Sequence, residues 1–288
     1  MKRNTATFAC VLSLALLLLW TGPCLAADSC KAVYGHGPHR LRLATGSPGE
    51  LGLLKALADA FLGRHNAALC WKKAGSGKSL SLLHRRQVDM VMVHAPAAEK
   101  AAVDQGWAAK RTLIGANEFF IVGPKDDPAG IRGCSSAAQA YRNIAAAKIR
   151  FLSRGDNSGT HKKEMAIWKK AGITPAGNWY VVTKAFMMAT LKQAEREKAY
   201  FMVDSSTWVA GKKGFRNIRV LFRGDPFLIN VYHALCLPPG AGGEQPLAEA
   251  MIEFIASPAG QRIIRQFGNQ AYGHPLYNDA ADARRCEH

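Results

Sequence analysis

Four short segments of the chain combine glycine with hydroxyl or cationic side chains, a combination that suits the binding of an anion. The backbone N–H groups at the start of a helix are free to donate to an anion, and hydroxyl and guanidinium groups supply further donors. The sequence therefore predicts a site built from hydrogen-bond donors. The four segments are Ala44–Glu50, Ala74–Ser79, Ser153–His161 and Thr183–Thr190.

The first segment has the composition of a helix start. Ser47 can cap the helix, Pro48 suits its first turn, and Glu50 completes a capping box. In a second interpretation the hydroxyls of Thr45 and Ser47 face a ligand, together with free N–H groups of the turn. A capping role would turn the Glu50 carboxylate away from a bound anion, so the two interpretations are compatible.

The second segment contains Gly77-Lys78-Ser79, which matches the end of a nucleotide-binding P-loop. That motif also needs a glycine five residues before Gly77, where this chain has Lys72. We therefore predict no nucleotide site. The glycine-rich turn that contains Ser76 and Gly77 is instead expected to lead into a helix at Leu80 and to offer its N–H groups to a small anion.

The third and fourth segments supply the positive charge. Arg154 is the candidate for a charged donor, because a guanidinium presents a fork of N–H groups and keeps its charge. Ser158 adds a hydroxyl shortly before a helix, and Lys184 follows a predicted strand, where it could add a second positive charge. Phe186 is expected in the core, although with Lys184 it could instead form a larger pocket for an organic acid. Asp156 could accept the proton of a ligand or could cap the helix, and the sequence leaves both roles open.

The N-terminus predicts secretion. Two basic residues precede the apolar run Phe8–Trp20, which is too short to span a bilayer, since about 20 residues are needed. Small residues follow, and we predict a signal peptide over residues 1–26 that is cut after Ala26. Lipid attachment at Cys24 is the alternative, against which the preceding proline argues.

Charge and cysteine content narrow the class of ligand. The net charge of +17 favours an anionic ligand or an acidic membrane surface, because a secreted protein seldom meets nucleic acid.

The spacing of the cysteines contains no CxxC, so we predict no zinc site, whereas disulfides are permitted outside the cell. A bridge between Cys30 and Cys286 would tie the ends together, but the pairing stays open. The cysteines after the predicted cut are Cys30, Cys70, Cys134, Cys236 and Cys286.

Strand-like and helix-like runs alternate along the chain, which predicts an α/β fold with a largely parallel sheet. In such a sheet the ligand crevice lies at the carboxyl ends of the strands, where the four segments fall. Helical spacing of apolar residues is present within 54–61, 165–168, 190–198 and 247–255. The predicted strands are 40–44, 88–93, 119–122, 148–152, 179–182, 200–203, 218–222 and 231–237.

A longer pattern around the third segment is similar to the tungstate-binding proteins of bacterial ABC transporters. The similarity extends over about Leu41 to Leu237 and implies a two-lobed periplasmic-binding-protein type II architecture, with the ligand cleft between the lobes. It implies one lobe from residues 38–122 plus 227–280 and a second from 123–226. The stretches that carry it are Phe151–Glu164, Trp168–Ile173, Trp179-Tyr180, Val91–Pro96, Phe120–Pro124 and Asp127–Ile131.

The resemblance implies a periplasmic binding component of an importer, which captures tungstate or molybdate and delivers it to an ABC permease in the inner membrane. It implies no enzyme activity, no cofactor, no metal ligands and no nucleic acid partner. Two cleft segments differ from the family, whose threonine-rich first turn corresponds to Ala44–Ser47 and whose Gly-x-Gly-Met-Gly corresponds to Lys184–Met188. The candidate ligand-binding residues are Thr45, Ser47, Ser76, Gly77, Arg154, Ser158 and Lys184.

Three alternatives remain from the sequence alone. The differences in the two segments leave room for another anion or a small organic acid. A sensor or adhesion protein could use the same fold without a permease. A secreted enzyme would need a metal set such as His94, His161 and Glu164, or a hydrolase turn at Gly155–Gly159, for which no matching His–Asp pair is evident.

Overall fold

The computed structural model describes residues 30–284. The predicted signal peptide, the alternative anchor at Cys24 and the thiol of Cys286 lie outside these residues. Within them, no helix is long and apolar enough to cross a membrane. The strands are β1 (Ala32–Gly35), β2 (His39–Thr45), β3 (Ala67–Lys73), β4 (Met90–Val93), β5 (Ala109–Pro124), β6 (Phe151–Ser153), β7 (Tyr180–Val182), β8 (Tyr200–Asp204), β9 (Ile218–Phe222), β10 (Ile229–Cys236) and β11 (Asn278–Asp279).

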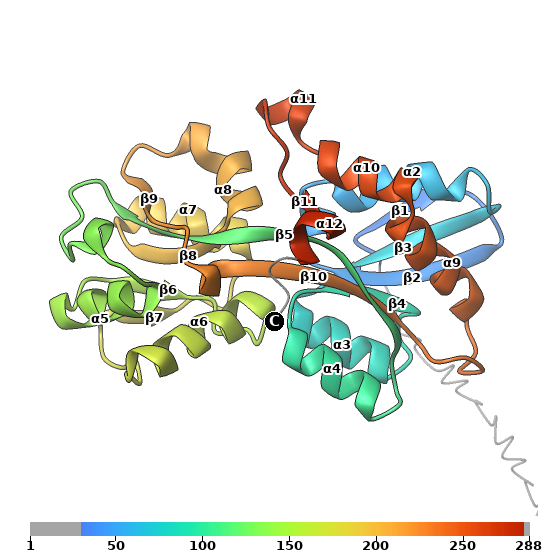
Figure 1. The fold of residues 1–288 in the computed structure, drawn as a ribbon, viewed down its shortest axis with the longest axis horizontal. Helices are drawn as coiled ribbons and strands as arrows, with labels where there is room; N and C mark the ends of the chain where they lie inside the picture. Colours follow the sequence, from blue (N-terminus) through green and yellow to red (C-terminus); the bar gives the residue numbers. More distant parts are fainter. Residues whose placement is uncertain (1–29, 285–288) are drawn as a thin grey trace, which may run out of the picture.

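Helices follow most of the strands and cover the sheet on both sides (Figure 1). They are α1 (Ser47–Glu50), α2 (Leu53–Leu62), α3 (Ser76–His84), α4 (Pro96–Asp104), α5 (Ala137–Ala147), α6 (Gly159–Ala171), α7 (Met187–Glu197), α8 (Ser205–Gly211), α9 (Gln245–Ala256), α10 (Pro258–Gln266), α11 (Asn269–Tyr272) and α12 (Ala280–Ala283), with short 3-10 turns at Ile131–Gly133, Lys212–Gly214 and Pro226–Leu228.

The strands form one mixed sheet in the order β1-β3-β2-β4-β10-β5-β8-β6-β7, and β9 and β11 also pair with β5. Strand β2 is parallel to β3 and β4, and β6 is parallel to β7 and β8. The other pairings are antiparallel, so the prediction of a largely parallel sheet is wrong. The reason is that β10 returns against β5 and β4, which reverses the direction in the middle of the sheet.

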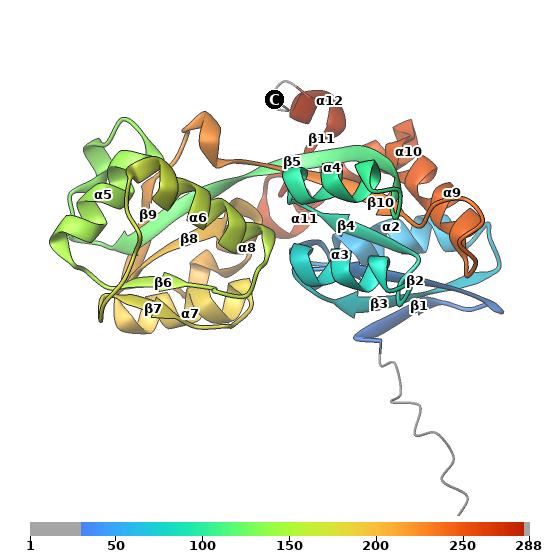
Figure 2. The same cartoon turned by 90° about the horizontal axis from the view of Figure 1, so that it is seen from below.

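Two halves share the sheet, and β5 and β10 run from one half into the other (Figures 1 and 2). One apolar core lies between residues 119 and 228, and we call the half around it the middle lobe. Two further cores come mainly from residues before 119 and after 228, and we call that half the terminal lobe. Strand β5 pairs with β10 through its first part and with β8 and β9 through its second part.

Local sequence explains where the helices next to the site begin and end. The Ser158 hydroxyl caps α6 by accepting from the N–H of His161, and Gly172 ends that helix in a left-handed conformation. Lys148 also has a left-handed conformation, with φ of 52°, and it ends α5. The predicted strand 148–152 therefore begins too early, and β6 starts only at Phe151.

The first cysteine of the described chain is bonded to the second. Cys30 and Cys70 form a disulfide with Cα atoms 5.3 Å apart, which ties the segment before β1 to β3. A bridge from Cys30 to Cys286 is therefore wrong, because the Cys30 sulfur is already bonded. Cys134 and Cys236 are free thiols.

Candidate functional site

A small cavity lies between the two lobes, at the ends of strands and the starts of helices. Its volume is about 10 Å³, which accommodates roughly one water-sized sphere. No carboxylate is among the residues that line it. The terminal lobe contributes Thr45, Gly46, Ser47, Pro48, Gly75, Ser76, Met92, His94 and Tyr232, and the middle lobe contributes Arg154, Ser158 and Phe186.

Two serine hydroxyls line the cavity, one from each lobe. The Ser76 hydroxyl accepts from the N–H of His94 at 3.1 Å, and the Ser158 hydroxyl accepts from the N–H of His161 at 3.2 Å. A hydroxyl has one proton and two lone pairs, so Ser76 still has its proton to donate, whereas the Ser158 hydroxyl also bonds to the Asp156 carboxylate. Both residues are almost completely buried. The arrangement suits a ligand that carries acceptors only.

Arg154 supplies the positive charge of the cavity and is 4% exposed. Its Nε and Nη2 atoms donate to the same carboxylate oxygen of Asp156, at 3.1 and 2.5 Å. The other Asp156 oxygen accepts from the N–H of Ser158 at 3.1 Å. Burial by itself would raise the pKa of Asp156, but the Arg154 charge and the bonds from Ser158 and Arg154 outweigh it and lower that pKa. Asp156 therefore fixes the guanidinium and lies outside the lining.

The first segment lines the cavity but does not form the predicted capping box. Gly46 is the residue before α1 and makes no side-chain cap, whereas Ser47 is already helical, so the predicted capping box is wrong. Glu50 instead forms an ion pair with Lys73. The Thr45 hydroxyl donates to the Met92 carbonyl at 2.8 Å, which uses its only proton. The Ser47 hydroxyl reaches a carboxylate of the middle lobe and donates to Asp204 at 3.3 Å.

Two predicted residues lie outside the lining. Gly77 packs against the middle lobe, and a Cβ atom at this position would lie 2.4 Å from the Asn157 carbonyl oxygen. Lys184 is exposed and has a left-handed conformation. Phe186, two residues further along, lines the cavity instead. We expected Phe186 mainly in the core. Met92 lies in the stretch Val91–Pro96 that carries the resemblance, and Tyr232 in a predicted strand, but neither was predicted as a cavity residue.

The His94 side chain lines the cavity and contacts a residue of β10. Its Nδ1 atom lies 2.8 Å from Asn230 Oδ1. Burial lowers the pKa of His94 to about 4, and the charge of Asp204 and the bond to Asn230 offset only part of this effect. His161 accepts from the Asn157 N–H, and Glu164 accepts from Tyr180. Between residues 30 and 284, no group of three or more potential ligands could hold a metal, so His94, His161 and Glu164 form no metal set.

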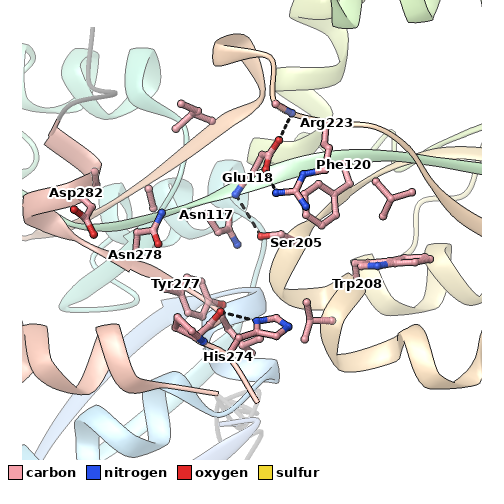
Figure 3. Close-up of a pocket in the computed structure, with 18 of the residues that line it drawn as sticks. Asn117, Glu118, Phe120, Ser205, Trp208, Arg223, His274, Tyr277, Asn278 and Asp282 are labelled. Atoms are coloured by element: carbon pink, nitrogen blue, oxygen red, sulfur yellow. Dashed lines mark hydrogen bonds and ion pairs between the residues drawn. The ribbon is translucent and has the colours of Figure 1, made fainter. Parts of the chain in front are cut away.

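A larger cavity of about 610 Å³ lies beside β5 and shares no residue with the first (Figure 3). Glu118, Asp225 and Asp282 contribute carboxylates to its wall. Its Arg223 lies 3.5 Å from Glu118 and is largely exposed. This mixture of charges favours an anion less than the donor-lined cavity does.

Comparison with known proteins agrees with the fold. A profile of the PBP superfamily domain matches residues 32–259. The tungstate-binding protein TupA of Peptoclostridium acidaminophilum is 32% identical, and the alignment covers 98% of this chain and 99% of that protein.

Two solved structures have similar sequences and folds. The tungstate ABC transporter protein from Geobacter sulfurreducens is 35% identical with a TM-score of 0.72, over 81% of this chain and 100% of that one. The tungstate-binding protein TupA from Desulfovibrio alaskensis G20 is 37% identical with a TM-score of 0.68, over 84% of this chain and 98% of that one.

Proposed function

The chain belongs to the PBP superfamily and, within it, to the family of the tungstate-binding proteins, and from that premise we propose that it captures tungstate or molybdate between its lobes. The observation that carries the proposal is the lining of the cavity. Arg154 and Ser76 present donors to one small space, Ser158 lines it as well, and no carboxylate does. Charged hydrogen bonds in a space without water are stronger than in solution.

A donor-lined cavity selects for an oxyanion without a proton. Tungstate, molybdate and sulfate are tetrahedral dianions that carry no proton at neutral pH, so they need donors only. Phosphate retains a proton there and needs an acceptor in its site. The nearest candidate acceptor, Asp156, is occupied by Arg154 and the N–H of Ser158. We therefore expect phosphate to bind more weakly than tungstate, molybdate and sulfate.

The proposal includes a compartment and a partner. A signal peptide over residues 1–26 would deliver the chain to the periplasm, where it passes its ligand to an ABC permease in the inner membrane. We assign residues 38–122 plus 227–280 to one lobe and 123–226 to the other. A solute-binding protein of this kind carries its ligand and is not an enzyme.

A small organic acid is the second candidate, because Phe186 brings an aromatic ring into the lining. The donor lining argues against it, since Arg154 and Ser76 approach one small space from opposite lobes and so match a ligand with acceptors on several sides better than a single carboxylate group. Tungstate therefore remains first.

Calorimetric titration of the mature protein with tungstate, molybdate, sulfate and phosphate tests the proposal. We expect Arg154→Ala to weaken tungstate binding by at least about 100-fold, because it removes charged hydrogen bonds. The double variant Arg154→Ala/Asp156→Asn separates this loss from the effect of an unpaired carboxylate. Arg150→Ala, an exposed arginine paired with Glu197, is the matched control. Absence of binding of all four anions to the unaltered protein would overturn the proposal.

A further inference from the structure

Phe186 occupies a position where local structure favours a different residue. It precedes α7 as the N-cap and makes no side-chain cap, although Ser, Thr, Asp and Asn are preferred there. It also belongs to none of the apolar cores, whereas Met187 and Leu191 of the same helix are buried in the middle lobe. Its ring lines the cavity instead. Neither helix capping nor core packing therefore explains this side chain.

The ring contacts cations from both lobes. The Nζ atom of Lys73, at the end of β3 in the terminal lobe, lies 4.2 Å from the ring centroid. The Cζ atom of Arg154, in the same lobe as Phe186, lies 5.4 Å from it. Both distances are within the range of a cation–π interaction, which strengthens when water is excluded. Lys73 is further held by its ion pair with Glu50.

We propose that Phe186 is an interlobe latch, which holds the lobes closed through Lys73 and shields the Arg154 guanidinium from water. This inference rests on the proposed function, since the latch would retain the captured oxyanion. Lys73 is only 26% exposed and Glu50 only 20%, so the contact is partly withdrawn from solvent. Because Glu50 already fixes the Lys73 ammonium, Lys73 loses little further side-chain freedom when closure of the lobes brings it to the Phe186 ring.

Phe186→Leu tests the latch, because leucine keeps an apolar side chain but has no aromatic face. We expect tungstate to bind roughly 3- to 30-fold more weakly to this variant, measured by calorimetry. Phe227→Leu is the matched control. The centroid of the Phe227 ring lies 4.7 Å from the Nζ atoms of both Lys163 and Lys170, but the ring is outside the cavity. This control should bind tungstate as the unaltered protein does.

A double-variant cycle identifies the cation. Glu50→Gln/Lys73→Met removes the ion pair as a unit, and in that background Phe186→Leu should lose most of its effect on tungstate affinity. A dissociation constant of Phe186→Leu for tungstate within twofold of that of the unaltered protein would overturn the latch. An equally large loss in both backgrounds would show that Lys73 is not its partner and would overturn it as well.

Small-angle X-ray scattering separates failure of the latch from failure of the proposed function. If the unaltered protein binds no oxyanion, the proposed function fails, and the ligand-free scattering profiles decide about the latch. Phe186→Leu should then have a larger radius of gyration than Phe227→Leu, because the lobes separate. Equal radii would contradict the latch in that case.

Discussion

At the scale of single residues, Glu164 is a carboxyl group buried among aromatic side chains. It lies on α6 and is 1% exposed. Its Oε1 atom accepts from the Tyr180 hydroxyl at 2.6 Å and from Trp168 Nε1 at 3.3 Å. Burial raises the pKa of Glu164 to about 7, although these hydrogen bonds lower it in part. The carboxyl group therefore changes its charge close to neutral pH.

This raised pKa predicts how stability depends on pH. The unfolded chain releases the Glu164 proton near pH 4.5, but the folded chain retains it until about pH 7. The contribution of Glu164 to stability is thus fully present below pH 4.5 and is lost as the pH rises through 7. Glu164→Gln should remove this loss, which amounts to roughly 3 kcal/mol at most. The free energy of unfolding in urea, compared between pH 5 and pH 8 for the variant and the unaltered protein, measures this loss.

The control for this prediction is Glu249→Gln, a partly exposed glutamate of α9 that lies 3.8 Å from Lys110. It should change the free energy of unfolding by a similar small amount at both pH values. If Glu164→Gln shows the same difference between pH 5 and pH 8 as the unaltered protein, Glu164 does not titrate as described.

The sequence indicates which residue types are near the cavity better than it indicates what each atom does. Thr45 and Ser76 both line the cavity, but Thr45 donates to a carbonyl and Ser76 accepts from an N–H. That difference depends on the neighbouring strand β4 and the turn after it, which periodicity does not specify. Lys184 has φ of 51°, so the turn presents Phe186 to the cavity instead.

At the scale of elements, β5 and β10 join the lobes and carry a buried chain of polar side chains. Asn117 and Asn230 are direct partners in the sheet, and Asn230 Nδ2 donates to Asn117 Oδ1 at 2.7 Å. Asn230 Oδ1 pairs with His94, and Asn117 Nδ2 donates to Ser206 at 3.2 Å. Ser206 in turn donates to Asp204. The wall of the cavity is thus connected through the crossing strands to the middle lobe.

Asn230→Ala should destabilise the protein by about 2–4 kcal/mol. The substitution leaves the Asn117 side-chain Oδ1 and the His94 Nδ1 without their partners, and each unpaired buried polar group costs roughly 1–3 kcal/mol. The free energy of unfolding in urea measures this loss. Asn278→Ala is the control, because Asn278 is exposed on β11, also next to β5. Comparable losses in the two variants would show that the buried polar chain adds little to stability.

Elements with a simple apolar pattern could be predicted, and those with a mixed pattern could not. Ile218–Phe222 is a strand with the predicted bounds, and α2 buries the predicted face. Strand β3 went unpredicted because its apolar run, Ala67–Trp71, is short and is followed directly by Lys72 and Lys73. The first part of β5 begins with Lys110 and Arg111, although it forms half of the crossing between the lobes. Its length follows from pairing with β10, a contact distant in sequence.

At the scale of the whole molecule, glycines allow the two lobes to approach each other closely. A Cβ atom on Gly75 would lie 2.9 Å from the Ser158 Cβ, and one on Gly159 would lie 2.5 Å from the His94 carbonyl oxygen. These positions surround the cavity on both lobes. The net charge of +17 attracts anions to the molecule, but only contact between the lobes can exclude water from a bound one.

Gly77→Ala should therefore weaken tungstate binding without weakening the fold. A Cβ atom at this position would lie 2.4 Å from the Asn157 carbonyl oxygen, so the lobes cannot close as they do here. Alanine favours the helix α3 by up to about 1 kcal/mol over glycine, so the ligand-free protein should be as stable as before or more stable. We expect the dissociation constant to rise at least about tenfold in calorimetry, with an unchanged or higher melting temperature.

Gly63→Ala is the control for this opposite pair of effects, because nothing lies within 4 Å of a Cβ atom at Gly63. It should leave the affinity for tungstate unchanged. A Gly77→Ala protein that binds tungstate normally would mean that the ligand is held without the close lobe contact seen here. A loss of both affinity and stability would instead mean that Gly77 serves the fold of the terminal lobe. Only weaker binding by a protein that is at least as stable as the unaltered one assigns the glycine to closure.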